Sequence, residues 1–456
     1  MVKDLTQGKP FPVLLRFALP VIGGNLFQLF YTLADSIIVG RMLGADALAA
    51  VGSTSIVVYL VLCFIQGVSG GFGICLGQRF GAGDEAAMRR SASVSWLLTV
   101  LFSVVLTIAG CLLAHPILGW MQTPAGIEQD AYAYLFVILA GTGATFFYNT
   151  ISNLLRALGD SRTPLIFLVV SSLGNIALDV LFIGPLGLGV AGAAWATVLS
   201  QLIAAVLSTL VGFRRYAVLR GGRIEKAQRL PEIGAHLRVG FPMGFQMSVM
   251  CIGQLAMQAA VNALGASAIA GYTAATKVDQ FSVLINGAFG IAIANYVAQN
   301  YGARAYGRIR SGVRASLVQI ECANVLMAAL MLLCRRQVVS LFIDAPTETI
   351  IGYATGYFTA VAPFYPLLGL LLVYRSTEQS MDDSRSPFAA CMIELVMRLC
   401  GTAGLARVMG YTGVCLASPL AWLGAVSLLI PVYYRRTLHF GRETSGGKRT
   451  ADQIAA

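Results

Sequence analysis

Twelve long apolar stretches, separated by short polar segments, run through the 456 residues of the chain. An α-helix needs roughly 20 residues to cross ~30 Å of hydrocarbon, and each stretch is about that long. A segment inside a membrane must form its backbone hydrogen bonds internally, which favours helices. The pattern therefore predicts an all-α integral membrane protein with twelve transmembrane helices, at residues 15–40, 48–77, 91–114, 129–155, 164–184, 188–213, 239–263, 268–298, 312–334, 350–376, 386–406 and 412–434.

The polar segments between the spans contain a repeat. The sequence Asp160-Ser161-Arg162-Thr163-Pro164 returns as Asp383-Ser384-Arg385-Ser386-Pro387, an offset of 223 residues, close to half of the chain. Other pairs share this offset to within a few residues, such as Leu43-Gly44-Ala45 with Leu264-Gly265-Ala266. Each half holds six spans, an even number, so both halves enter the membrane from the same side. The repeat predicts two parallel six-helix bundles.

The repeat also predicts the domain organisation. We expect an N-terminal lobe at 1–213 and a C-terminal lobe at 239–434. The basic segment 214–238 between them is expected to be a cytoplasmic linker, oriented by its positive charge or bound to anionic lipid. The polar tail 435–456, rich in Gly, Ser and Lys, is expected to be disordered.

Composition agrees with a membrane protein and explains the charge. Hydrophobic residues make up 57% of the chain, charged residues 12%, and mean hydropathy is +0.74. With both termini in the cytoplasm, the inner segments carry 26 Lys and Arg residues and the outer loops carry four. This bias predicts cytoplasmic termini by the positive-inside rule and explains the net charge of +11 without a nucleic-acid partner. No cleavable signal peptide is evident, so the first span is expected to be retained.

The motifs of several enzyme classes are absent from the sequence. The segment 441–448 resembles a phosphate-binding loop, but its spacing is one residue too long and Arg449 stands where Ser or Thr is needed. No histidines are paired at a zinc spacing. A glycine cluster, Gly70, Gly71, Gly73 and Gly77, lies inside an apolar span and predicts close helix packing. We therefore expect no enzyme, no cofactor and no bound structural metal.

Ionisable residues inside spans are costly in hydrocarbon, so they are candidates for function. Asp35 in the first span and Asp179 in the fifth lie at similar depth below the outer surface. Asn175 is one helical turn from Asp179, and Thr197 in the sixth span lies at comparable depth. Two carboxylates brought together at low dielectric constant cannot both stay ionised cheaply, which suits binding of H⁺ or Na⁺. The alternative is a hydrogen-bonded polar cluster that only holds these helices together.

The second half does not repeat this acidic pair. The offset sends Asp35 to about Ala256 and Asp179 to about Thr402. Other charges occur instead: Glu394 and Arg398, four residues apart, are predicted to form a structural ion pair. Three further residues are candidates for binding substrate or a second ion, namely Lys277, Asp279 and Glu321.

A stripe of flexible side chains follows one face of the seventh span: Met243, Met247, Met250, Gln254 and Met257. Thioethers and an amide can line an adaptable surface for drugs, and they can equally fill gaps between packed helices. Pro20 and Pro242 occupy equivalent places in the first and seventh spans. A proline inside a helix removes a hydrogen bond and permits a bend.

The order of these motifs resembles the multidrug and toxic compound extrusion (MATE) transporters, in their DinF- and MepA-like bacterial branch. The resemblance covers nearly all of residues 10–435. It rests on the segment 34–40 followed by Leu43-Gly44, and on 78–83, 155–164 and 175–179, in this order.

The resemblance implies two six-helix lobes around a V-shaped cavity and export of hydrophobic, often cationic compounds in exchange for H⁺ or Na⁺ by alternating access. It also implies an ion site on the first, fifth and sixth helices, which corresponds here to Asp35, Asn175, Asp179 and Thr197. The expected partners are small-molecule drugs or toxins and membrane lipids, and the expected state is a monomer in the bacterial cytoplasmic (inner) membrane. A flippase for lipid-linked precursors, from the same superfamily, is the alternative function.

Overall fold

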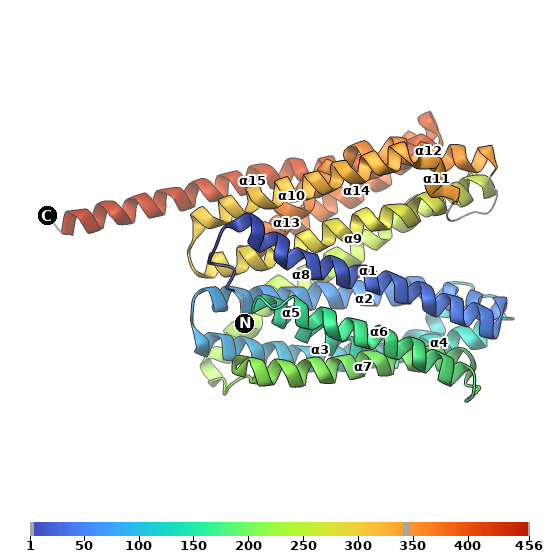
Figure 1. The fold of residues 1–456 in the computed structure, drawn as a ribbon, viewed down its shortest axis with the longest axis horizontal. Coiled ribbons are helices and arrows are strands. Elements are labelled where there is room, and N and C mark those ends of the chain that lie inside the picture. The colour runs from blue at the N-terminus through green and yellow to red at the C-terminus, as the bar shows by residue number, and fades with distance from the viewer. Residues whose placement is uncertain (1–3, 341–346, 455–456) are drawn as a thin grey trace. The chain divides into compact units, whose positions relative to one another are not determined.

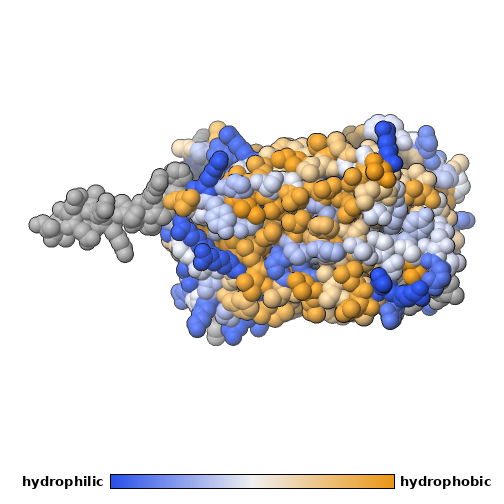
Figure 2. Space-filling model, turned by 90° about the horizontal axis from the view of Figure 1, so that it is seen from above, coloured by the Kyte–Doolittle hydropathy of each residue, from blue (hydrophilic) through white to orange (hydrophobic). Residues whose placement is uncertain are grey.

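Helices form the whole architecture of the computed structural model, which describes residues 4–340 and 347–454. Eleven described helices are long and apolar enough to cross a membrane, and a bent pair supplies a twelfth span. The prediction of an all-α membrane protein with twelve spans is confirmed. Figure 1 shows the course of the helices, and in Figure 2 hydrophobic residues cover the middle of the visible face, with hydrophilic residues gathered near the helix ends.

The structure divides into two compact units. The first comprises residues 19–248 and the extreme N-terminus, and the second comprises residues 5–18 and 249–456. Two helices pass from one unit into the other, α1 (Pro10–Leu43) and α8 (Lys226–Asn262). The other elements of the first unit are α2 (Ala45–Gly81), α3 (Glu85–Trp120), α4 (Glu128–Ala140), α5 (Thr142–Ala157), α6 (Arg162–Ile183), α7 (Gly189–Arg215) and the 3₁₀ turn η1 (Ala217–Arg220). Those of the second unit are α9 (Ala266–Gly302), α10 (Tyr306–Leu333), α11 (Arg335–Ser340), α12 (Glu348–Val361), η2 (Ala362–Phe364), α13 (Tyr365–Ser380), α14 (Arg385–Met409) and α15 (Tyr411–Ile454).

This division differs from the predicted lobes at both ends of the first half. The first turns of α8 belong to the first unit, because Gly240 and Gly244 pack backbone-close against α2. The segment 214–238 is therefore only partly a linker: it contains the end of α7, η1 and the start of α8. Residues 5–18 belong to the second unit, where the Leu5 amide donates to Gln299 at 2.8 Å.

The polar tail is continuous with the last span, and its predicted disorder stays a prediction. Helix α15 continues to Ile454, so the structure assigns helix to most of the segment that its composition predicts to be disordered. Extending a helix by one residue costs far less than nucleating a new one, which favours continuation from the last span. Residues 455 and 456 of that predicted tail lie outside the described residues.

Glycines at equivalent places separate consecutive helices in both halves. Gly44 and Gly265 join α1 to α2 and α8 to α9, with φ of 94° and 96°. Gly189 is the first residue of α7, with φ of 58°, and Gly410 directly precedes α15, with φ of 57°. Only glycine adopts these angles without strain. The sequence repeat is thus a repeat of backbone conformation.

Two of the twelve spans are interrupted. Helices α4 and α5 meet at Gly141 with a bend of 44°, and a Cβ on Gly141 would lie 2.2 Å from Val198 of α7. Glycine is therefore needed where α7 crosses the bend. In the second unit, η2 separates α12 from α13 within one long span, at a place where prolines remove backbone donors.

Candidate functional site

Three helices of the first unit bring the predicted ion-site residues together. Asp35 lies on α1, Asn175 and Asp179 lie one turn apart on α6, and Thr197 lies on α7. Helices α6 and α7 are joined by a short turn at 184–188 and pack against each other along their length. This hairpin places the sixth-span threonine beside the fifth-span amide, at the common depth that the sequence predicts.

Hydrogen bonds fix the amide between the two helices. The Asn175 Nδ2 group donates to Thr197 Oγ1 at 3.4 Å, and Thr197 Oγ1 donates to the Ala193 carbonyl at 3.1 Å. Since its nitrogen points to Thr197, the amide oxygen of Asn175 is directed elsewhere and accepts no hydrogen bond from the described residues. The threonine thus orients the amide.

The Asp35 and Asp179 carboxyl groups lie within electrostatic range of each other. Asp179 is fully buried, Asn175 is 1% exposed, and Asp35 is half-buried. As carboxylates neither can donate, and both oxygens of Asp179 and Oδ1 of Asp35 are buried without a donor among the described residues. Four oxygens, counting that of Asn175, therefore lack a positive partner. A buried acceptor without a partner costs free energy, which a proton or a cation would recover.

Two tyrosines near the carboxylates were not predicted from the sequence. The phenol groups of Tyr31 on α1 and Tyr134 on α4 lie within electrostatic range of Asp35. The spacing of Tyr31, one turn before Asp35, is a signal that could have found it. Nothing in the sequence connects Tyr134 with Asp35, since α4 approaches α1 only in the folded bundle.

An apolar cluster adjoins the site and includes residues one to four positions further along the same helices. It contains Val39 after Asp35, Ile183 after Asp179 and Val198 after Thr197, together with Tyr134. These side chains are at most 9% exposed. They lower the local dielectric constant, which strengthens every electrostatic interaction of the neighbouring carboxylates.

In the second unit, the three residues predicted to bind substrate lie in different environments. Lys277 of α9 is exposed, whereas the Asp279 carboxylate is half-buried and accepts a hydrogen bond from the Tyr365 hydroxyl at 2.5 Å. Glu321 of α10 is half-buried beside Gly369 of α13, and both its carboxylate oxygens lack a donor among the described residues. The three do not form one cluster, and their roles stay predictions.

The residues of the predicted methionine stripe of α8 also lie in different environments, because some of the side chains are buried and others are exposed. Met257 is 3% exposed and its sulfur accepts from the Ser418 hydroxyl at 3.2 Å, so it serves as packing. Met247 is 42% exposed and Gln254 is exposed. Met250 contacts an arginine, and Met243 lies next to Gly70 of α2 in the first unit. A common drug-binding surface for these residues stays a prediction.

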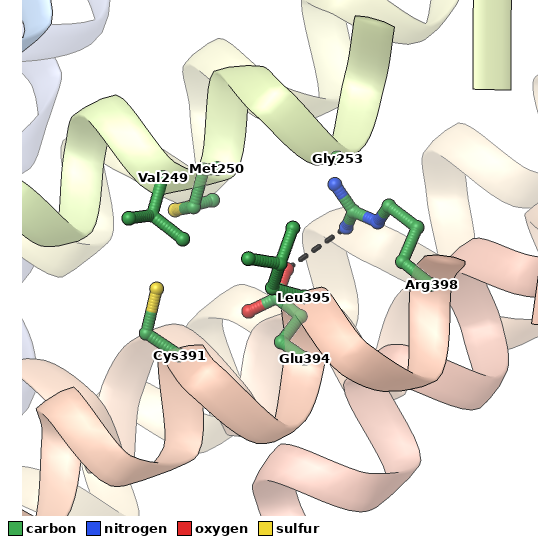
Figure 3. A pocket seen from close by; sticks show the side chains of 7 residues that line it. All are labelled: Val249, Met250, Gly253, Cys391, Glu394, Leu395 and Arg398. Carbon is green, nitrogen blue, oxygen red and sulfur yellow. Dashed lines mark hydrogen bonds and ion pairs between the residues drawn. The ribbon is translucent and has the colours of Figure 1, made fainter. Parts of the chain in front are cut away.

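Glu394 and Arg398 form the predicted ion pair, with Arg398 Nη2 2.8 Å from Glu394 Oε1. The structure adds Arg375 of α13, whose Nη2 lies 2.6 Å from Glu394 Oε2. Because Arg375 lies at the inner end of the predicted tenth span, the sequence places it with the cytoplasmic positive charges. Figure 3 shows a pocket between α8 and α14, where Arg398 faces Gly253, Cys391 points towards Met250, and the Glu394 carboxylate lies between Arg398 and Cys391.

Comparison with known proteins adds independent evidence. A protein-family model described as MatE matches residues 20–181 and again 242–402, which confirms the internal repeat. The probable multidrug resistance protein YpnP of Bacillus subtilis is 29% identical over 433 residues, which cover 95% of this chain and 96% of YpnP. The FAD transporter of Shewanella oneidensis is 24% identical over 416 residues, 90% of this chain and 91% of that protein.

Among solved structures, the outward-facing conformation of a multidrug resistance MATE family transporter of the MOP superfamily has a TM-score of 0.89 at 23% identity. The match covers 97% of this chain and 98% of that one. At this identity the likeness concerns the fold alone. The family match covers more than half of the chain, so the chain belongs to the multidrug and toxic compound extrusion (MATE) family and is a membrane transporter, not an enzyme.

Proposed function

We propose that the chain is a secondary active antiporter that exports hydrophobic, often cationic compounds in exchange for H⁺ or Na⁺ by alternating access. The observation that carries the coupling is the group of four buried oxygens without donors at Asp35, Asn175 and Asp179. The multidrug name of YpnP supports the substrate class. We propose that it acts as a monomer in the bacterial cytoplasmic membrane. The positive-inside bias supports a cytoplasmic position for both termini.

The residues fit either coupling ion. A proton on one carboxyl would donate to the other and remove the repulsion between them. A sodium ion would take hard oxygen ligands, which are the carboxylates, the Asn175 amide oxygen and the Thr197 hydroxyl. In both cases the bound ion neutralises charge at a place where charge is costly.

Coupling follows from two states of one site. When the site takes its ion from the outer side, the negative charge of the first unit falls and the attraction for a cationic compound weakens, which favours release outward. When the site loses its ion to the cytoplasm, the carboxylates again attract a cation. Since ion and compound bias the same equilibrium, each must change the affinity for the other by the same factor.

Proteoliposomes loaded with a fluorescent organic cation test the proposal. Under an imposed pH gradient or an imposed Na⁺ gradient, the wild type is expected to export the cation with one of the two ions. Asp35→Asn and Asp179→Asn are each expected to reduce coupled export to the background of protein-free liposomes. Asp46→Asn, an exposed aspartate in the first turn of α2, is the matched control and is expected to keep wild-type export. Full export by both site variants would overturn the mechanism.

A further inference from the structure

The repeat relates the ion site of the first unit to a cluster of opposite charge in the second. The shared pentapeptide spans the starts of α6 and α14, so the offset of 223 residues holds along both helices. At this offset Asn175 corresponds to Arg398 and Asp179 corresponds to Thr402. One turn before Arg398 lies Glu394, at the place of Ser171. The helix that carries acceptors in the first unit thus carries donors in the second.

The donors of this second cluster outnumber its acceptors. Arg375 and Arg398 are each 6% exposed at the side chain, and Glu394 is 3% exposed. Each guanidinium offers five N–H donors, whereas the carboxylate accepts one hydrogen bond from each arginine. The Nε groups of both arginines are buried without an acceptor among the described residues. Arg375 Nη1 reaches only the sulfur of Met250, at 3.5 Å, a weak acceptor.

Neighbouring charges do not complete the cluster. Another carboxylate within electrostatic range of Arg398 is that of Asp279 on α9. It forms no ion pair of 4.0 Å or less with either arginine among the described residues, and Tyr365 donates to it instead. Cys391 and Tyr272 are further titratable groups within electrostatic range of the cluster. Two guanidinium cations and one carboxylate leave a net positive charge, and an uncompensated buried charge is strongly unfavourable.

A small pocket lies beside the Arg398 side chain, which packs closely against α8. Gly253 of α8 faces Arg398, and a Cβ there would lie 2.9 Å from Arg398 Cδ. The pocket lined by Gly253, Met250, Glu394 and Arg398 is small and partly open, with room for about one water-sized group. Such a pocket accepts a monatomic anion or the end group of a larger molecule, not a whole drug.

We propose that Arg375, Glu394 and Arg398 form a binding site for one monovalent anionic group, the charge-inverted counterpart of the cation site in the first unit. Two sources share this chemistry, a free halide ion and the carboxylate of an organic compound. A guanidinium binds either, and it binds a carboxylate in a bidentate manner. The site goes beyond the proposed antiport, because anion binding needs no coupling ion.

Thermal unfolding of the purified full-length protein in detergent tests the site. The buffer contains sulfate, which is neither a halide nor a carboxylate, as its only anion, and bromide or benzoate is added at constant ionic strength. We expect a saturable rise of the unfolding temperature with at least one anion. Bromide alone would assign the site to a halide, and benzoate alone or with greater affinity would assign it to a carboxylate group.

Three variants separate an anion site from a purely structural triad. Arg398→Gln is expected to abolish the anion-dependent rise, whereas Arg407→Gln, at an exposed position of the same helix, is expected to keep it. Glu394→Gln removes the competing carboxylate, so it is expected to tighten anion binding about tenfold or more. If the triad is purely structural, the unfolding temperature will not depend on the anion in the wild type or in any variant.

The proposal does not depend on the stability of one variant. If Arg398→Gln does not fold, Gly253→Ala displaces the same guanidinium by contact and is expected to weaken anion binding. The absence of any saturable shift in the wild type would overturn the proposal. A shift that survives in Arg398→Gln would also overturn it. So would a Glu394→Gln variant that folds and has lost the shift.

Discussion

Asp160 and Asp383, in the two halves of the chain, make the same three hydrogen bonds at the starts of α6 and α14. In each, one carboxylate oxygen accepts from two backbone amides at 3.0–3.2 Å, and the other accepts from a side-chain hydroxyl at 2.7 Å. An arginine from the last helix of each half then approaches the carboxylate. The distance is 3.7 Å for Arg215 and 3.4 Å for Arg436. The duplicated pentapeptide is thus a duplicated helix cap with its own counter-ion.

The two arginines are expected to contribute unequally to stability. Arg436 is 27% exposed and also contacts Glu378, which is fully buried, at 3.4 Å. Arg215 is 59% exposed and pairs in a more aqueous environment. Arg436→Gln leaves a buried carboxylate without its cation and is expected to cost about 3 kcal/mol, whereas Arg215→Gln is expected to cost less than about 1 kcal/mol. Thermal unfolding in detergent compares them, and equal losses would contradict the difference in burial.

Tyr216, which lies outside the spans, is expected to make the folding stability depend on pH. Burial, and next the Asp160 carboxylate, raises the pKa of the Tyr216 hydroxyl above its ordinary value of about 10. The hydroxyl donates to Asp160 at 3.0 Å. Because the folded state holds this proton more tightly than the unfolded chain, the stabilisation is complete below pH about 10 and is lost as the pH rises further.

Tyr216→Phe is therefore expected to be less stable than the wild type at pH 7, by about 1–2 kcal/mol, with the difference shrinking above pH about 10. Unfolding temperatures measured at several pH values check this. Tyr306→Phe, a half-buried tyrosine at the start of α10, serves as the control. A difference that grows with pH would show that the sign is wrong.

Glycines in α2 predict which positions admit no side chain. A Cβ on Gly67 would lie 2.4 Å from the Met243 carbonyl oxygen, and one on Gly71 would lie 2.4 Å from Gly240 Cα. Both contacts are with backbone, which cannot rotate away. Gly67→Ala and Gly71→Ala are expected to destabilise the protein by roughly 1–3 kcal/mol through overpacking.

Gly52 provides the matched control for these two variants. It lies in the same helix, and a Cβ there would meet nothing within 4 Å. Gly52→Ala is expected to be neutral or to stabilise the helix by up to about 1 kcal/mol, since alanine has the higher helix propensity. Thermal unfolding of all three variants checks the prediction, and an equal loss at Gly52 would contradict it.

Removal of the Thr197 hydroxyl is expected to weaken ion binding at the proposed site without abolishing it. Its hydroxyl holds the Asn175 amide, so Thr197→Val frees the amide while keeping the shape of the side chain. The loss of one hydrogen bond, about 1 kcal/mol, is expected to lower the affinity of the site for the coupling ion about fivefold. The measurement is the half-maximal H⁺ or Na⁺ concentration for export. Thr209→Val, three turns further along α7, is expected to leave it unchanged.

The candidate ion site shows how far sequence reasoning extends. Asp35, Asn175, Asp179 and Thr197 could be grouped because depth along a span follows from residue number at 1.5 Å per residue. The contribution of Tyr134 could not be predicted, since it depends on the side from which α4 approaches α1. Arg375 was missed for a related reason: a residue near the end of a span is buried or exposed according to its neighbours, not its position.

The sequence by itself determined the membrane character, the number of spans, the repeat and the depth of the acidic pair. These properties follow from the cost of placing charge or unpaired backbone in hydrocarbon, which each residue bears separately. Only the tertiary structure decided which helical faces meet: that Met257 is packed while Met247 is exposed, and that Arg375 joins Glu394. Rotation of a helix about its axis depends on close packing against its neighbours, which hydropathy along the chain does not specify.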